Sequence, residues 1–262
     1  MKKVQNQINK LFNQKKKDIL SIYFTAGFPK LNDTATIINS LSDAGADLIE
    51  IGIPFSDSVV DGPTIQHSNQ VALENGMTLD ILLNQLEGIR ESTNIPLIMM
   101  GYLNPIYQYG VERFCKRCKS IGIDGLIIPD LPIQEYERSY REIFEENNLH
   151  MIFLISPQTS SDRIKMIDGI TDSFIYVVSS AATTGAKSEV SEDQVAYFSR
   201  IDNLNLKNPR LIGFGISNHT TFLKACENAN GAIIGSAFVT ALKEANDIES
   251  AVRDFVGGIR NK

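Results

Sequence analysis

The chain has 262 residues, a formal net charge of −6 and a sequence pI near 5.2. This length fits one large α/β barrel, although it would also allow two ordinary domains. The acidic balance argues against a nucleic-acid partner, which would need clustered basic surface. The sequence shows no apolar run long enough to span a membrane and no secretory signal. Its three cysteines suit a reducing compartment, so we expect a cytoplasmic protein.

Short apolar runs alternate with longer amphipathic runs, which is typical of βα units and a parallel sheet. The pattern predicts eight strands, at Leu20 to Ala26, Leu48 to Ile53, Pro96 to Tyr102, Gly125 to Pro129, Met151 to Ser156, Phe174 to Ser179, Arg210 to Gly215 and Gly231 to Gly235. It predicts helices that include Val4 to Lys16 before the first strand, Asp33 to Ala44, Leu79 to Glu91, Glu112 to Ser120, Glu135 to Glu146 and Thr220 to Ala229.

Eight βα units favour closure into a TIM (β/α)8 barrel with an extra N-terminal helix, formed as one domain over residues 1–262. An open doubly wound sheet is the alternative. That fold usually has a glycine fingerprint, G-x-G-x-x-G, after its first strand, whereas this chain reads TAGFP at residues 25–29. The barrel is therefore the favoured architecture.

The second predicted strand carries a charged residue on an inner position. Alternation places Ile49 and Ile51 under the helices and Glu50 inside the barrel. Burial of an unpaired carboxylate raises its pKa, which allows proton transfer near neutrality. The alternative is a structural glutamate that neighbouring hydroxyls satisfy. Asp61 follows in the next loop, where catalysis and capping of a helix that begins at Pro63 are equally compatible with the sequence.

Glycines recur at the ends of the last two predicted strands, in GFGIS at residues 213–217 and GAIIGS at residues 231–236. Glycines there let backbone N–H groups approach an oxyanion, and a following helix adds its dipole. The pair predicts a phosphate site. Small residues from Ser179 to Lys187 predict a lid, although an ordinary solvated loop has the same composition.

Two kinds of aldolase chemistry lack their residues. None of the eight predicted strands contains a lysine for a Schiff base. The three histidines, His67, His150 and His219, are scattered and have no metal-binding spacing, so we expect no metal site. Cys115 and Cys118 have redox or half-zinc spacing, but they fall in a helical pattern with no second pair and are interpreted as structural.

Residues 50–57 read EIGIPFSD, and residues 61–66 read DGPTIQ. These two segments closely resemble the signature of the tryptophan synthase alpha subunit family. The resemblance extends along essentially the whole chain, through TAG at 25–27, GYLNP at 101–105, PDLP at 129–132, Tyr176, Thr184-Gly185, GFGIS at 213–217 and Gly235-Ser236.

The resemblance implies a lyase of tryptophan biosynthesis that cleaves indole-3-glycerol phosphate to indole and D-glyceraldehyde 3-phosphate. It implies that Glu50 shuttles protons and that Asp61 binds the indole N–H. It also implies substrate contacts at Tyr176, Thr184 and Phe214. It implies phosphate contacts at Gly185, Gly215, Gly235 and Ser236.

The family further implies a protein partner, the tryptophan synthase beta subunit, in an alpha2-beta2 heterotetramer. Pyridoxal phosphate is expected in that partner and no cofactor on this chain, and Pro54, Asp57 and Asn104 match positions near the intersubunit surface. The lid reads Ala182-Thr183-Thr184-Gly185 where many members have Gly-Val-Thr-Gly, and the lost glycine is expected to stiffen it. A phosphosugar isomerase or other barrel lyase and a non-catalytic partner protein are the alternative functions.

Overall fold

The computed structural model describes residues 4–178, 192–213 and 215–261. All paired strands run parallel in one sheet with the order β5-β4-β3-β2-β1-β9-β8-β7-β6. The strands are β1 (Ile19–Thr25), β2 (Leu48–Gly52), β3 (Leu97–Met100), β4 (Gly125–Ile127), β5 (His150–Met151), β6 (Phe153–Ile155), β7 (Ile175–Val178), β8 (Arg210–Gly213) and β9 (Gly231–Ile234).

The fifth predicted strand is divided into two short segments. β5 pairs with β4 and β6 pairs with β7, while Ile152 between them donates its N–H to the Leu126 carbonyl at 3.0 Å. The two segments together act as one barrel strand that changes its hydrogen-bond partner midway. The eight-fold barrel predicted from the sequence is therefore confirmed, with nine strand segments in place of eight.

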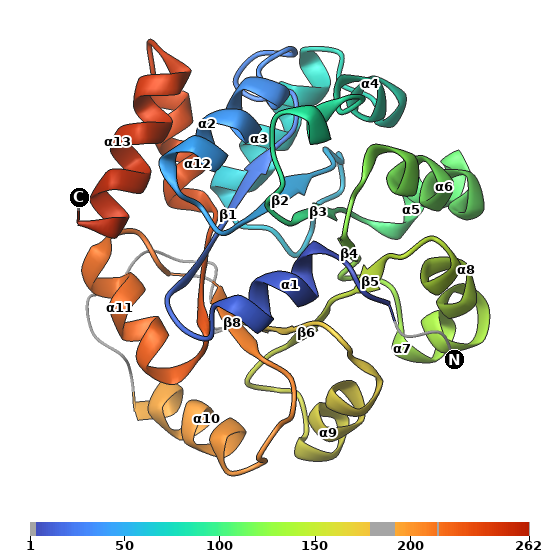
Figure 1. Ribbon diagram of the computed structural model, residues 1–262, viewed down its shortest axis with the longest axis vertical. Helices are drawn as coiled ribbons and strands as arrows, with labels where there is room; N and C mark the ends of the chain where they lie inside the picture. The colour runs from blue at the N-terminus through green and yellow to red at the C-terminus, as the bar shows by residue number, and fades with distance from the viewer. Residues whose placement is uncertain (1–3, 179–191, 214, 262) are drawn as a thin grey trace.

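Helices surround the barrel (Figure 1). They are α1 (Gln7–Gln14), α2 (Thr34–Ala44), α3 (Pro63–Glu74), α4 (Leu79–Gln85), η1 (Ile89–Glu91), α5 (Leu103–Tyr109), α6 (Val111–Ile121), α7 (Ile133–Glu135), η2 (Tyr136–Tyr140), α8 (Arg141–Glu146), α9 (Ser161–Ile170), α10 (Glu192–Asp202), α11 (His219–Asn228), α12 (Ser236–Glu244) and α13 (Ile248–Arg260).

Two predicted helices are interrupted. The helix expected over Leu79 to Glu91 ends at Gln85 and resumes as a short 3-10 turn, because Gly88 adopts a left-handed conformation with φ of 77°. The helix expected over Glu135 to Glu146 contains a π-helical segment, η2.

The extra N-terminal helix closes one end of the barrel. Figure 1 shows α1 lying across the end of the ring of strands. Its Ile8 and Phe12 belong to the interior cluster of strand side chains, and the Phe12 ring lies 5.5 Å from that of Phe174. The side chains of α1 therefore fill the N-terminal end, and the opposite end is left for the loops that follow the strands.

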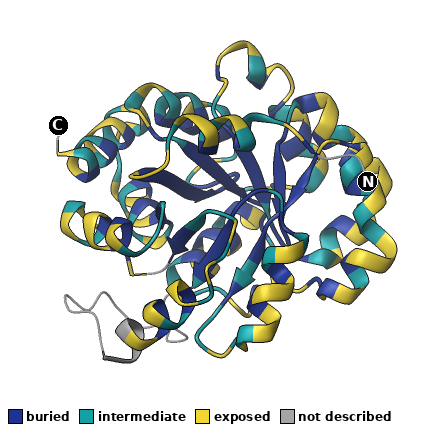
Figure 2. Cartoon of the chain, turned by 60° about the horizontal axis from the view of Figure 1, so that its bottom comes forward, coloured by how far each residue is buried: buried dark blue, intermediate teal, exposed yellow. Residues whose placement is uncertain are grey.

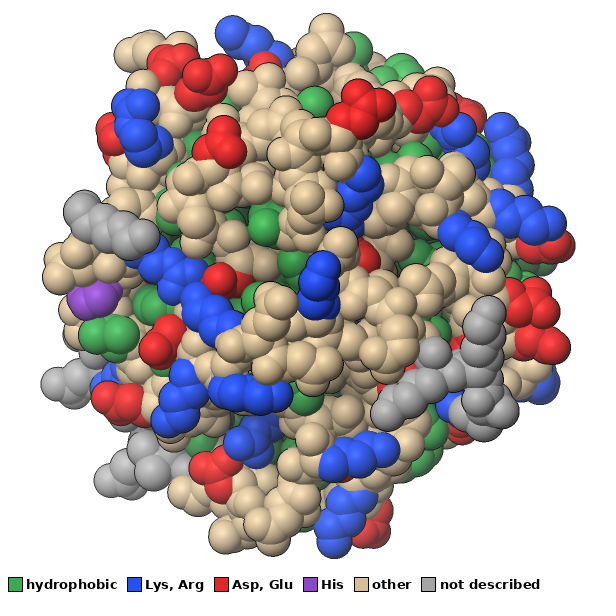
Figure 3. All heavy atoms as spheres, in the orientation of Figure 1, with side chains coloured by type: hydrophobic (Ala, Val, Ile, Leu, Met, Phe, Trp, Pro, Cys, Tyr) green, Lys and Arg blue, Asp and Glu red, His purple; other side chains and the backbone are tan. Residues whose placement is uncertain are grey.

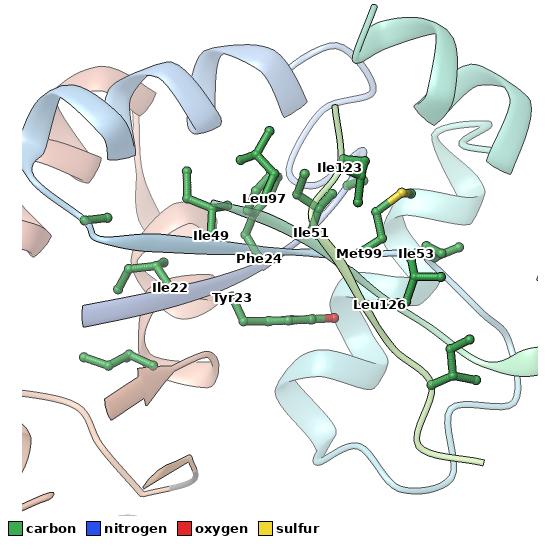
Figure 4. Packing of buried hydrophobic residues seen from close by; sticks show 14 of the residues in the cluster. Ile22, Tyr23, Phe24, Ile49, Ile51, Ile53, Leu97, Met99, Ile123 and Leu126 are labelled. Atoms are coloured by element: carbon green, nitrogen blue, oxygen red, sulfur yellow. The ribbon is translucent and has the colours of Figure 1, made fainter. Parts of the chain in front are cut away.

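Strand alternation separates two apolar layers. Ile49 and Ile51 pack between the barrel and the helices, whereas Leu48 belongs to the interior cluster. Figure 4 shows Tyr23 on the side of β1 and β2 opposite to Phe24, Ile49 and Ile51. Glu50 is fully buried, as expected for the inward position that this alternation predicts.

The outer surface is polar and mixed in charge. In Figure 2 the strands are buried and the helices expose their outer sides. Basic and acidic side chains are interspersed on the face shown in Figure 3. Within the described ranges, no helix is long and apolar enough to cross a membrane.

Candidate active site

Glu50 lies at the centre of the inner surface of the barrel. Its side chain is fully buried, and Ser21 Oγ on β1 donates a hydrogen bond to Oε1 at 2.7 Å. Among the described residues, the other oxygen, Oε2, has no hydrogen-bond partner. Burial raises the pKa of Glu50 from 4.5 to about 7, against the lowering effect of the Ser21 hydrogen bond. Both protonation states are therefore accessible near neutrality.

Two tyrosines share this inner surface. Tyr23 on β1 is in register with Glu50 on β2, and Tyr176 projects from β7. Burial raises the pKa of both phenols, and the negative charges of Glu50 and Asp61 raise them further. Both hydroxyls therefore keep their protons across the physiological range. A Cβ at Gly52 or Gly213 would overlap the Tyr23 or the Tyr176 hydroxyl, respectively, so the two glycines make room for the rings.

Asp61 lies on the loop between β2 and α3. The residue that caps α3 is Gly62, and no side chain caps this helix, so the capping role left open by the sequence is not adopted. The Asp61 carboxylate instead accepts a hydrogen bond from the Tyr102 hydroxyl at 3.4 Å. Burial raises the pKa of Asp61 to about 6, and hydrogen bonds from Tyr102 and Ser58 oppose the rise. Above this pH the carboxylate can balance a positive charge.

The predicted phosphate residues are only partly described. Gly215 follows β8 and has φ of 77°, a left-handed conformation that favours glycine. Gly235 is the residue before α12, and Ser236 is its first residue. A Cβ on Gly235 would lie 3.5 Å from the Tyr23 ring, which places this end of β9 beside the inner tyrosine. Backbone N–H groups at the start of α12 can bind an anion there.

Thr184, Gly185 and Phe214 fall outside the described residues, as does the predicted lid. The predicted interface residues lie in the loops and helices that follow β2 and β3. Asp57 is exposed and accepts a hydrogen bond from Ser56 Oγ at 2.6 Å, whereas Pro54 is buried. Asn104 is exposed in the first turn of α5.

Apolar side chains are exposed in the same region. Val59 and Val60 lie in the Asp61 loop with 80% and 49% exposure, and Tyr107 of α5 has 62%. The Tyr102 hydroxyl accepts the Val60 N–H at 3.1 Å, and the same hydroxyl donates to Asp61. The Tyr102 hydroxyl therefore contacts two adjacent residues of this loop, Val60 and Asp61.

Three residues of this site were not predicted. Ser21 and Tyr23 share the inner face of β1, and the alternation argument used for Glu50 would have found them if it had been applied to this strand. Tyr102 lies two residues after the end of β3, but its contact with Asp61 depends on the path of a loop, for which the sequence carries no periodic signal.

The cysteines and two of the histidines have structural surroundings. Cys115 and Cys118 are buried on α6, and burial raises the pKa of both thiols, that of Cys115 to about 12. His150 contacts Asp172 and Asn9 through its two ring nitrogens, each at 2.7 Å. The ring of His219 contacts the Ile259 carbonyl oxygen at 2.8 Å.

Comparisons with known proteins give one family throughout. The family model described as tryptophan synthase alpha chain matches residues 9–259. The tryptophan synthase alpha chain of Flavobacterium johnsoniae is 58% identical over 247 residues, which cover 94% of this chain and 97% of that protein.

Two solved structures extend the match to the fold. Tryptophan synthase subunit alpha from Legionella pneumophila is 32% identical with a TM-score of 0.88, over 98% of each chain. A chain of the tryptophan synthase complex from Pyrococcus furiosus is also 32% identical, with a TM-score of 0.85, over 95% of this chain and 100% of that chain. The chain therefore belongs to the tryptophan synthase alpha chain family.

Proposed function

We propose that Glu50 and Asp61 carry out the carbon–carbon cleavage of this lyase, with Glu50 as the proton shuttle and Asp61 as the partner of the indole nitrogen. As a member of the tryptophan synthase alpha chain family, the protein cleaves indole-3-glycerol phosphate in tryptophan biosynthesis. The observation that carries the assignment is the fully buried Glu50, with one anchored oxygen and a pKa of about 7. A group with this pKa can donate a proton and accept another in one reaction cycle.

The reaction needs a proton at one carbon and loses one at a neighbouring oxygen. Protonated Glu50 delivers its proton to indole C3, which makes the ring an electron sink. The resulting carboxylate takes the proton of the hydroxyl next to the breaking bond. The electron pair of that O–H bond forms the new carbonyl bond, and the electron pair of the breaking carbon–carbon bond returns to the indole ring. Indole and glyceraldehyde 3-phosphate result, and Glu50 ends the cycle protonated.

Asp61 stabilises the intermediate of that sequence. Protonation at C3 places positive charge on the indole nitrogen, and a carboxylate at the N–H balances this charge. The pKa of about 6 leaves Asp61 ionised at neutral pH while Glu50 is half protonated. Two carboxyl groups with different pKa values can thus take the two roles.

The phosphate of the substrate is assigned to the ends of β8 and β9. Gly215, Gly235 and Ser236 supply backbone N–H groups, and the start of α12 adds a favourable dipole. Gly185 is proposed for the same group, and Tyr176, Thr184 and Phe214 for the indole and glycerol parts. The position of Gly235 beside Tyr23 supports a substrate that extends from the phosphate loops to the inner carboxylate.

The family also implies a beta-subunit partner. We assign it to the surface that includes Pro54, Asp57 and Asn104, where exposed Val59 and Tyr107 supply apolar contact area. The assembly is proposed to be an alpha2-beta2 heterotetramer with pyridoxal phosphate in the partner. The single-domain organisation and the cytoplasmic location stay predictions.

An indole-release assay on indole-3-glycerol phosphate tests the proposal, with and without a tryptophan synthase beta subunit. Glu50→Gln keeps the shape of the side chain but cannot shuttle a proton, so we expect it to abolish indole release and to retain substrate binding. Turnover by Glu50→Gln would refute the assignment of Glu50. If the unaltered chain released no indole even with its partner, a non-catalytic role would be favoured.

A further inference from the structure

The hydroxyl of Ser21 is the polar group that anchors Glu50. Ser21 and Glu50 are both fully buried, and the hydrogen bond from Ser21 Oγ to Glu50 Oε1 measures 2.7 Å. In the register of β1 and β2, Tyr23 lies opposite Glu50 and Ser21 lies opposite Leu48. The donor therefore comes from one inner position deeper in the barrel, on the side toward α1.

The surroundings of Ser21 are otherwise apolar. Its neighbours in register are Leu48 on β2 and Ile233 on β9, and both belong to the interior cluster. A buried hydroxyl costs free energy unless it is hydrogen-bonded, so an aliphatic side chain would suit this layer better. The position of the serine is explained by its bond to the carboxylate.

This bond makes the two carboxyl oxygens unequal. Oε1 accepts the serine hydrogen bond, whereas Oε2 has no partner among the described residues. A carboxyl group with one oxygen fixed has a restricted orientation and offers its other oxygen for proton exchange. The arrangement is suited to a group that must deliver a proton and take one back within a single substrate complex.

We propose that Ser21 is a positioning residue for the cleavage reaction: it holds Glu50 Oε1 from the deeper layer, makes Oε2 the oxygen that transfers the proton, and favours the ionised carboxylate. This inference rests on the proposed role of Glu50. The ionisable groups beside this carboxyl are Tyr23 of β1 and Tyr176 of β7, and the charges of Glu50 and of Asp61, in the β2–α3 loop, raise the pKa of both phenols.

The hydrogen bond from Ser21 lowers the pKa of Glu50, against the larger effect of burial, which raises it. A donor to a carboxylate stabilises the charged form, so its removal leaves burial unopposed. The expected consequence of Ser21→Ala is a Glu50 midpoint about one pH unit higher. Protonated Glu50 is then a weaker acid, so it gives its proton to indole C3 less readily and forms less of the carboxylate that takes the hydroxyl proton. We expect kcat at pH 7 to fall about tenfold, with less than a twofold change in KM.

The test compares Ser21→Ala and Ser21→Thr in the full chain. Carboxyl titration is followed by NMR with 13C-labelled glutamate side chains, and the Glu50 signal is assigned by its loss in Glu50→Gln. Ser21→Thr keeps the hydroxyl and is β-branched, which suits a strand, so it should retain the midpoint and most of the kcat. Ser42→Ala is the matched control, since it removes a serine hydroxyl whose hydrogen bond has the same length, 2.7 Å, but joins it to Thr93 Oγ1 outside the barrel interior.

An unchanged Glu50 midpoint in Ser21→Ala would overturn the proposal, as would an equal upward shift in Ser42→Ala. A shift in Ser21→Ala that Ser21→Thr restores would support it. The NMR titration does not depend on turnover. If Glu50→Gln proved active, the role assigned to Glu50 would fail, while the titration would still show whether Ser21 controls the ionisation of this carboxyl.

Discussion

Replacement of Glu50 by Gln is expected to stabilise the protein while it abolishes catalysis. Burial raises the pKa of Glu50 from 4.5 to about 7 in the folded chain. Below pH 4.5 the group is protonated in both the folded and the unfolded state and costs nothing. As the pH rises from 4.5 to 7, the unfolded chain ionises and the folded chain does not, so the free energy of unfolding falls, and above pH 7 the loss is constant.

The size of this loss follows from the pKa difference of about 2.5, at about 1.4 kcal/mol per pH unit, which gives about 3 kcal/mol above pH 7. Full burial of the side chain means that solvent screening does not reduce the value. Glutamine does not ionise and can still accept the Ser21 hydrogen bond through its carbonyl oxygen. The stability advantage of Glu50→Gln should therefore grow by about 2 to 3 kcal/mol between pH 5 and pH 8.

Urea unfolding of the two proteins at half-unit steps from pH 5 to pH 8 measures this difference. Glu244→Gln, at an exposed position of α12, is the matched control, because it makes the same chemical change on the surface. The Glu50→Gln advantage should rise with pH, whereas the control should show no comparable trend. An advantage for Glu50→Gln that is the same at every pH would refute the reasoning, because it would mean that Glu50 titrates alike in both states.

Three further changes have defined outcomes. Asp61→Asn should lower kcat/KM for indole-3-glycerol phosphate by about 100- to 1000-fold and remove the acid limb of the pH profile near pH 6; an unchanged limb in steady-state assays would contradict the role of Asp61. Gly213→Ala places a Cβ against the hydroxyl of Tyr176 on β7 and should lower the free energy of unfolding in urea by about 1 to 3 kcal/mol. Gly169→Ala, in open space on α9, should leave it unchanged or raise it slightly. Ile8→Ala removes a fully buried side chain of α1 and should cost about 2 to 5 kcal/mol, against less than about 0.5 for exposed Lys10→Ala in the same thermal or urea melts.

The barrel could be predicted from the sequence because its strands carry a strong local signal. A strand buried on both faces gives a nearly continuous apolar run, and runs such as Ile19–Thr25 need no tertiary information to be found. The division of the fifth strand at Ile152 could not be predicted, since it depends on which neighbour each backbone group pairs with. The break before η1 has a local cause, because Gly88, the residue before η1, adopts a left-handed conformation that favours glycine.

The candidate site divides in the same way. Glu50 could be found because a charged residue breaks the apolar pattern of an inner strand position. Asp61 could not be separated from a helix cap, because the choice depends on where the loop carries its carboxylate. In the structure the Asp61 carboxylate accepts a hydrogen bond from Tyr102, a residue 41 positions later in the chain, and does not cap α3.

The inward positions of the barrel carry apolar side chains at its N-terminal end and the candidate catalytic carboxylate nearer its C-terminal end. At the N-terminal end, α1 inserts Ile8 and Phe12 among the strand side chains, and full burial of such residues contributes about 1.5 to 3 kcal/mol each. Nearer the C-terminal end, the same inner face carries Glu50, whose burial costs about 3 kcal/mol at neutral pH and above. The two quantities are of equal order, so burial of the apolar side chains of the extra helix can offset the cost of the buried Glu50 carboxylate. Exclusion of water makes the apolar contacts of α1 favourable and also raises the pKa of Glu50, so both effects have one physical cause.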